Sequence, residues 1–342
     1  RITTIKMVFP RYLLAELNTH RMFSRNSASS RAIPFKKMVK SAEDTPFIPM
    51  AFQKDHKGMQ GTSYLTGIKF KNAVDNWLLA RDSAIINAKS LHSLGITKQL
   101  CNRILEPFIY HTVLVTATQW DNFFNLRCPQ YSLFSENMPL SFKSKKEFNS
   151  FVAKVGDEPY SLSDLDWYSI NEGQGEIHIM DLAEKTWDAM NESTPDVLED
   201  GEWHIPFDDN IDVESKEFYD ILQTYTSRSS ETRTRIDEIR IKIATARCAR
   251  ISYETLGDIP KIDYEADIKL HDNLLKSGHF SPFEHCGCAM TYKEYDTHIS
   301  GIINDRREAK DLTREEAKRV CGWSKNFRGF IQYRELIEQN NN

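Results

Sequence analysis

Hydrophobic positions recur at helical spacing through most of the chain. A long amphipathic helix that stops near Gly95 is predicted by apolar residues on one face: Val74, Trp77, Leu78, Ile85, Ala88 and Leu91. Thr97 is suited to cap a following helix that ends before Pro107. Further helices predicted from spacing cover residues 112–126, 177–190, the C-terminal half of 224–249, and 264–277 up to Gly278.

Both ends of the chain carry strand-like patterns. Residues 2–10 alternate weakly and contain β-branched side chains, which predicts a strand. A helix should follow to about Phe23, because Leu13, Leu14 and Leu17 fall at helical spacing. Strands at the ends with helices between them predict an α/β or α+β fold in one domain, 1–342. Polar stretches at about 130–172 and about 195–225 should be insertions.

The segment 20–31, which should leave the first helix as a polar loop, holds the most informative chemistry. It contains three arginines, one histidine, four serines and an asparagine within twelve residues. Burying so many unpaired donors costs about 1–3 kcal/mol each, so an ordinary core element is excluded. Arginine forks, hydroxyls and turn amides together suit a phosphate and a planar heterocycle. The alternative interpretation is a basic surface turn.

Composition narrows the function classes only slightly. The 342 residues are 40% hydrophobic and 27% charged, with a net charge of −5. This acidic balance argues against a nucleic-acid coat protein, and no run of eighteen apolar residues predicts a membrane span. Six scattered cysteines suit a reducing cytoplasm. Cys286-Gly287-Cys288 invites a metal interpretation, but its spacing and the lack of a second pair favour core packing, so we expect no metal.

Several motifs resemble those of the flavin-dependent thymidylate synthases. His-Arg-x-x-Ser-x-Asn-x-x-Ser-x-Arg at residues 20–31 is similar to that family's core motif, with Thr19, Glu16 and Ser27 departing from its usual arginine, glutamine and glutamate. Further similar blocks occupy residues 94–107, 116–127, 173–177, 249–253 and 274–285. The last, ending Ser-Pro-Phe-Glu-His, follows the arginine-rich motif here, whereas it precedes it in the common form. The chain therefore resembles a circularly permuted, enlarged, phage-type member, which surface-exposed chain ends would allow.

The resemblance implies the family's fold, a mixed sheet with long helices, and reductive methylation of dUMP to dTMP. The implied cofactor is FAD, with methylenetetrahydrofolate and NADPH as co-substrates. It places Ser29, Ser30, Arg31 and Arg103 on the nucleotide phosphate and Arg127 on the pyrimidine ring, where Glu16 also faces the nucleotide. The residues implied in catalysis are His20, Ser29 and Arg127.

The resemblance also implies an FAD site. The matching positions are His20, Arg21, Ser27 and Asn122, and, from another subunit, Ser252, His279 and Ser281. Two FAD contacts of the family are replaced by Thr116 and Thr118. Our hypothesis is that Asn326 and Arg328 supply the missing donors; the alternative is an ordinary amphipathic terminal helix.

Three functions stay open at this point. The first is thymidylate synthesis; the second is modification of another pyrimidine nucleotide, for example hydroxymethylation of dCMP, which a carboxylate at Glu16 would favour. The third is a non-catalytic nucleotide-binding homologue. The resemblance further implies a homotetramer with residues 130–172 at its periphery, in the cytoplasm, or in the host cytoplasm if phage-encoded, without nucleic-acid or membrane partners.

Overall fold

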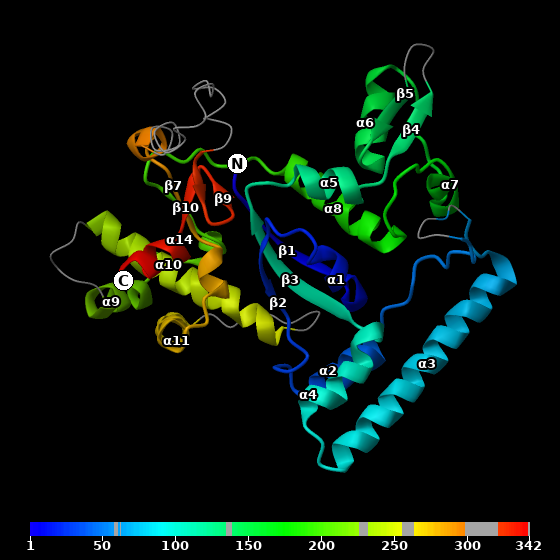
Figure 1. The fold of residues 1–342 in the computed structure, drawn as a ribbon, viewed down its shortest axis with the longest axis horizontal. Helices are drawn as coiled ribbons and strands as arrows, with labels where there is room; N and C mark the ends of the chain where they lie inside the picture. Colours follow the sequence, from blue (N-terminus) through cyan, green and yellow to red (C-terminus); the bar gives the residue numbers. More distant parts are fainter. Residues whose placement is uncertain are drawn as a thin grey trace, which may run out of the picture.

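A small three-stranded sheet forms the centre of the molecule (Figure 1). The structure is a computed structural model, and it describes residues 1–57, 61, 63–134, 139–225, 232–254, 263–297 and 321–340. The strands β1 (Thr3–Pro10), β3 (Tyr110–Ala117) and β2 (Ser24–Ser27) are antiparallel in the order β1-β3-β2. The α+β expectation is confirmed. The mixed sheet is wrong for the described pairings, which are all antiparallel.

Both faces of this sheet are covered. One face packs on a cluster that includes Met7, Phe9, Val113, Val115 and Phe123, from β1, β3 and α5 (Asp121–Arg127). The opposite face carries Leu114, which packs with Cys248 and Ile251. Because β3 is buried on both faces, its residues 111–117 are all buried and show no alternation of buried and exposed positions.

Three sequence predictions near this sheet are wrong. The helix expected over 112–126 is the strand β3 followed by the short helix α5, because β-branched residues in a two-sided core favour a strand. The helix expected to reach Phe23 ends earlier, as a 3₁₀ turn η1 (Arg11–Leu13) and α1 (Leu14–Leu17). Part of the expected polar loop is β2, which pairs along β3.

A helical arm extends from one end of the sheet. It consists of α2 (Phe35–Asp44), α3 (Gly67–Ser93), α4 (Lys98–Cys101) and the 3₁₀ segment η2 (Asn102–Phe108). The long helix is confirmed, and the Thr97 hydroxyl accepts the N–H of Gln99 as its expected cap of α4. Trp77, Ala84 and Ala88 face the arm's own apolar cluster.

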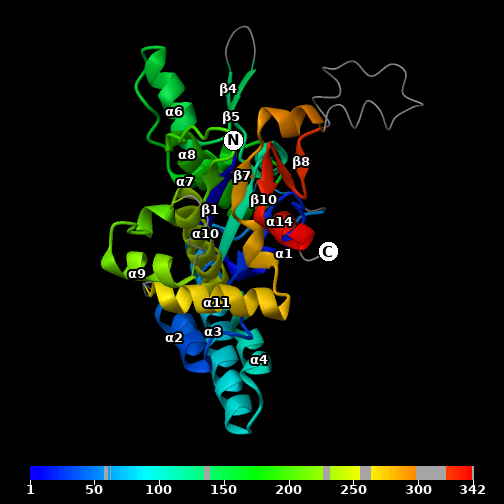
Figure 2. The ribbon, with the colours of Figure 1, turned by 90° about the vertical axis from the view of Figure 1, so that its left-hand side faces the viewer.

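The polar stretch 130–172 folds as a separate module beyond α5. Its elements are the hairpin β4 (Tyr131–Phe134) and β5 (Pro139–Phe142), then α6 (Lys145–Lys154) and α7 (Asp164–Ser169). Tyr131, Phe148 and Trp167 belong to its own apolar cluster. In both views the module lies above the helical arm (Figures 1 and 2), and the ring of Tyr168 on α7 contacts that of Tyr64, shortly before α3. The chain returns to the sheet through α8 (Ile177–Glu192), a helix that was predicted.

The rest of the chain packs beside the second face of the sheet. The described elements there are β6 (Trp203–His204), η3 (Asp208–Asn210), α9 (Lys216–Tyr225), α10 (Thr232–Arg250), η4 (Ile251–Tyr253), α11 (Tyr264–Ser277), η5 (Ser281–Glu284), β7 (Gly287–Ala289), β8 (Trp323–Ser324), β9 (Phe327–Arg328), β10 (Phe330–Gln332) and α14 (Tyr333–Asn340). Gly278 ends α11 in the left-handed conformation, with φ of +73°, as expected of a C-terminal glycine.

Two further expectations concern single features. Core packing is confirmed for Cys286, which is fully buried against Ile205, Ile241 and Ala244, whereas Cys288 is only partly buried. Among the described helices, none combines the length and the apolar character that crossing a membrane requires.

Candidate functional site

Three groups of polar contacts lie along the arginine- and serine-rich segment 20–31. The first joins the end of α1 to α5. The second surrounds the turn after β2. The third connects β2 with the C-terminal hairpin.

Arg127 is the centre of the first group. Its Nε donates to Nε2 of His20 at 3.2 Å, its Nη1 lies 3.4 Å from a carboxylate oxygen of Glu16, and its Nη2 lies 3.4 Å from the Thr19 hydroxyl. The structure therefore brings Glu16, His20 and Arg127 together. Distances of 3.4 Å are long for charge-assisted hydrogen bonds, so a ligand can compete for the same donors.

His20 supports Arg127 from inside the protein. Its ring is only 5% exposed and packs against Phe23 and Phe123. Burial, followed by the charges of Arg127 and Arg25, lowers the pKa of His20 to about 4. The imidazole is therefore neutral at pH 7, and because its Nε2 accepts from Arg127, its proton is on Nδ1. Its assigned role beside a flavin ring stays a prediction, while its contacts show that it orients Arg127.

Glu16 differs from an ordinary surface carboxylate. Its pKa is raised, mainly by burial, although the charge of Arg127 opposes that effect. Such a carboxyl group can act in two ways, depending on the ligand beside it. When ionised it accepts a hydrogen bond from an amino group, and when protonated it donates one.

The second group is a turn whose backbone is held rigidly. The carbonyl of Ser29 accepts the N–H groups of both Ala32 and Ile33, and the N–H of Ser29 donates to the carbonyl of Ser252 at 2.9 Å. Asn102, which is fully buried, donates to the carbonyls of Ser30 and Ile33 at 2.7 and 3.0 Å. These bonds fix the turn without using any arginine side chain.

The turn leaves its cations at the surface. Arg31 is exposed, and so is Arg103, which directly follows Asn102 at the start of η2. Ser30 is buried and Ser29 half-buried. Exposed guanidinium groups beside a fixed turn form a donor set that fits a phosphate.

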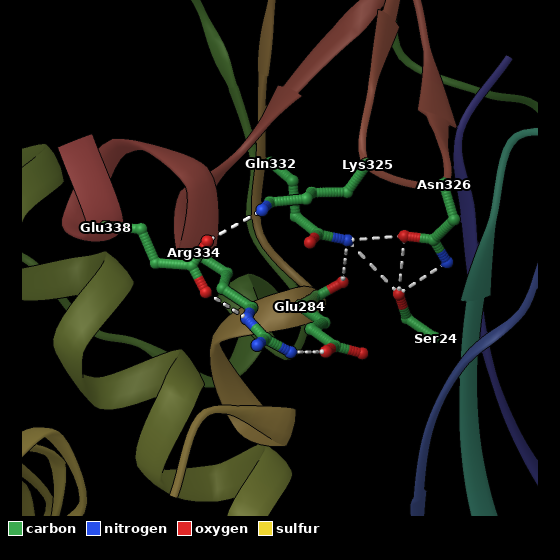
Figure 3. A network of polar contacts seen from close by, with 7 residues as sticks. All are labelled: Ser24, Glu284, Lys325, Asn326, Gln332, Arg334 and Glu338. Carbon is green, nitrogen blue, oxygen red and sulfur yellow. Dashed lines mark hydrogen bonds and ion pairs between the residues drawn. The ribbon is translucent and has the colours of Figure 1, made fainter. Parts of the chain in front are cut away.

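The third group joins β2 to the C-terminal hairpin (Figure 3). Asn326 donates through Nδ2 to the Ser24 hydroxyl at 2.9 Å and to the carbonyl of Met22 at 3.1 Å. Gln332 donates to Oδ1 of Asn326 at 2.7 Å and approaches the Ser24 hydroxyl at 3.3 Å. Arg334 forms an ion pair with Glu284 at 2.5 Å on the neighbouring η5.

This hairpin lies where the family's two FAD contacts are missing. Ser24 is the register partner of Thr116, and the backbone N–H of Arg328 donates to the Thr118 hydroxyl at 2.9 Å. Asn326 and Arg328 are thus beside Thr116 and Thr118, and the alternative of a simple terminal helix is wrong for residues 323–332. Their binding of FAD stays a prediction.

Among the described residues, no side-chain hydrogen bond joins the remaining expected site residues to these groups, and only Ser252 joins one of them through its backbone. Arg21, Asn122, His279 and Ser281 are exposed, and the His279 ring contacts the hydroxyl of Ser277 at 2.9 Å. Ser27 is half-buried on β2, and Ser252 contributes its carbonyl to the turn. Ser281 opens η5, and η5 and η4, which holds Ser252, both pack against β2.

Sequence reasoning missed two residues that build the site. Asn102 holds the turn at residues 29–33, and Gln332 connects Ser24 with Asn326. A polar residue directly before Arg103 was the available signal for Asn102. No local pattern marks Gln332, whose partner Ser24 is 308 positions away.

Two buried amide atoms in this region have no hydrogen-bond partner among the described residues: Nδ2 of Asn26 and Oδ1 of Asn102. Together with the exposed arginines and the serine hydroxyls they fit the polar groups of a nucleotide or dinucleotide. In the described part of the chain, His, Cys, Asp and Glu side chains form no group of three or more that could hold a metal ion.

Comparisons with known proteins give little similarity. No family model matches the chain, and no curated protein does. A solved structure of a UMP/dUMP methylase, PolB from Streptomyces cacaoi bound with 5-Br UMP, is 15% identical, with a TM-score of 0.30. The similarity covers 57% of this chain and 76% of that one. A similarity this low establishes neither the fold nor the activity of this chain.

Proposed function

We propose that the protein is an enzyme that reductively methylates a pyrimidine nucleotide, with dUMP as substrate and dTMP as product. The observation that carries the proposal is the convergence of Arg127, Glu16 and His20 at one end of segment 20–31 and of a rigid turn with exposed arginines at the other. A nucleotide presents a planar ring and a phosphate, which are the two groups that these ends suit.

Each end has a distinct task in this proposal. Arg31 and Arg103 bind the phosphate beside the turn at Ser29 and Ser30, and Arg127 binds the ring and balances negative charge that develops on it. His20 keeps the Arg127 guanidinium in place without adding a positive charge, because it is neutral.

The proposed cofactor is FAD, with methylenetetrahydrofolate and NADPH as co-substrates. When bound, these groups supply the hydride and the carbon that the protein lacks. Arg21, Ser27, Asn122, Asn326 and Arg328 would hold the flavin within one subunit. Ser252, His279 and Ser281 would do so from a neighbouring subunit. The flavin absorbance of the purified protein and dUMP titration test this arrangement; binding of dUMP without any flavin would favour a non-catalytic nucleotide-binding protein.

A second candidate is modification of a cytosine nucleotide, for example hydroxymethylation of dCMP. Glu16 favours it, because a carboxylate beside Arg127 can accept the amino group that cytosine has and uracil lacks. Comparing turnover of dUMP and dCMP by the protein and by Glu16→Gln separates the two candidates. Under the first, dUMP is the better substrate of both proteins; under the second, the protein turns over dCMP and Glu16→Gln loses that preference.

The proposal includes assembly into a homotetramer, and α3 provides a surface for it. Ile68, Leu79 and Ile86 are 65–69% exposed and lie eleven and seven positions apart, so they form a line opposite Ala84 and Ala88. Three exposed apolar side chains in line on an otherwise polar face suit contact with the same helix of another copy.

Ile86→Asp should therefore reduce the molecular mass of the assembly in solution, because it puts a charge on this line of apolar side chains. Val197→Asp is the matched control, since Val197 is 87% exposed in a different part of the molecule. A fully active monomer would contradict the assembly.

A further inference from the structure

Three hydroxyl-bearing residues lie side by side across the central sheet. Thr4 on β1 and Ser24 on β2 are both register partners of Thr116 on β3. Directly opposed residues of an antiparallel pair place their side chains on the same face. The hydroxyl oxygens of Thr4 and Thr116 are 2.7 Å apart, so they share a hydrogen bond.

A histidine contacts each of these two threonines. Nε2 of His204, on β6, lies 2.7 Å from the Thr4 hydroxyl, and Nδ1 of His285 lies 2.7 Å from the Thr116 hydroxyl. The four side chains form one continuous row, His204–Thr4–Thr116–His285. No part of the described site uses this row.

The two ends of the row differ in their surroundings. His204 lines an open groove together with Trp203, Phe207 and the charged residues Lys6, Asp196, Asp208, Asp209 and Arg240. His285 is completely buried, and its Nε2 has no hydrogen-bond partner among the described residues. The row therefore connects solvent with one unpartnered interior nitrogen.

The protonation states of the two histidines define which group donates and which accepts in each hydrogen bond of the row. Burial lowers the pKa of His204 to about 4 and that of His285 to about 3, and a positive charge on His204 would oppose one on His285, so both rings are neutral at pH 7. A neutral imidazole carries one N–H, and a buried N–H without an acceptor is rare. His285 should thus carry its proton on Nδ1 and donate to Thr116; Thr116 then donates to Thr4, and Thr4 to Nε2 of His204.

We propose that His204, Thr4, Thr116 and His285 form a directional proton relay between the interior beside β2 and the groove. A proton that reaches Nε2 of His285 releases the Nδ1 proton to Thr116, whose own proton passes to Thr4. The Thr4 proton passes to Nε2 of His204, and the Nδ1 proton of His204 leaves to water in the groove. One N–H or O–H bond breaks as each next one forms, and one proton crosses in total.

The use of this relay rests on the proposed function. Methylation at C5 of a pyrimidine replaces a hydrogen that must leave as a proton. The row begins at His285, which directly follows η5, and η5 packs against β2 of the arginine- and serine-rich segment. The row ends at the groove. His204, Thr4, Thr116 and His285 are thus assigned to proton removal and not to ligand binding.

The direction of the row is tested on the ligand-free protein by two-bond ¹H–¹⁵N spectra of labelled histidines. His204 and His285 should both show the Nδ1–H tautomer at pH 7. In Thr4→Val the donor to Nε2 of His204 is lost, so the ¹⁵N shift of that nitrogen should move to the value of an unbonded acceptor nitrogen. His285 should keep its proton on Nδ1, because its buried Nε2 still has no acceptor among the described residues. Thr4→Ser should keep the original pattern, and Thr112→Val, a buried change on the same face of β3, should alter neither ring.

An Nε2–H tautomer of His285 in the unaltered protein, or an Nε2 shift of His204 that does not respond to Thr4→Val, overturns the relay. The second measurement is tritium release from [5-³H]dUMP by the fully loaded enzyme, which Thr4→Val should slow by at least about tenfold. Unslowed release in Thr4→Val overturns the assigned use. If neither the unaltered protein nor Thr4→Val releases tritium while the tautomers are as expected, the proposed function is contradicted and the direction of the row is still supported.

Discussion

Arg31→Ala should weaken nucleotide binding by about 1.5–3 kcal/mol, the size of a hydrogen bond to a charged group, which is roughly a 10- to 150-fold rise in Kd. The substitution should change nucleotide affinity without changing the fold of the turn. Arg31 is exposed, and the turn beside it is held by Asn102 and by the backbone of Ser29 and Ser252. Truncating the guanidinium therefore removes a phosphate contact and leaves the fold of the turn intact.

The measurement is calorimetric titration of dUMP into the flavin-loaded protein. Arg31→Lys should recover only part of the loss, because a point charge does not reproduce a bidentate fork. Lys36→Ala is the matched control: it removes one exposed positive charge close in sequence but outside the turn, so nucleotide affinity should stay unchanged. If Arg31→Ala instead releases flavin and keeps full nucleotide affinity, the assignment of the turn to the phosphate is wrong.

Three further predictions follow from the contacts and pKa values. Asn102→Ala should lower the free energy of unfolding by about 1–3 kcal/mol, because it leaves two carbonyls unpaired; denaturant unfolding measures this against Asn87→Ala, an exposed helical control. Arg328→Ala should lower FAD occupancy, and unchanged absorbance per protein would refute its role. Burial lowers the pKa of four histidines from the ordinary 6.5 to about 3 to 4: His20, His111, His204 and His285. Below pH 6.5 the unfolded chain therefore binds more protons than the folded one, and the free energy of unfolding should fall as the pH drops toward 4. The fall is up to about 1.4 kcal/mol per pH unit for each histidine. Constant stability between pH 6.5 and 5 would contradict the last of these.

The helices could be predicted where one face is apolar and the other is wet. α3, α8 and α11 have this periodicity, and Thr97 and Gly278 mark ends whose capping geometry is local. The strand β3 could not be predicted, because it is covered on both faces. A short buried segment without alternation is compatible with a strand or a helix.

β2 shows a second limit of sequence reasoning. Ser24, Arg25, Asn26 and Ser27 have no apolar alternation, yet they form a strand because β3 offers backbone partners. The buried Ser24 hydroxyl then finds acceptors and donors on Asn326 and Gln332, about three hundred positions away. The motif resemblance singled out Arg127, Glu16 and His20, which the structure brings into contact. It did not single out Asn102, because the role of Asn102 is to hold backbone carbonyls.

The central claim is tested most directly by following a labelled carbon. The protein is supplied with FAD, NADPH, dUMP and methylenetetrahydrofolate that carries ¹³C in its methylene group, and the nucleotides are separated and identified by mass spectrometry. We expect dTMP with the label in its 5-methyl group, and loss of that product in Arg127→Ala. A labelled hydroxymethyl nucleotide from dCMP in its place would support the second candidate, and no labelled nucleotide from either substrate would contradict the proposed enzyme.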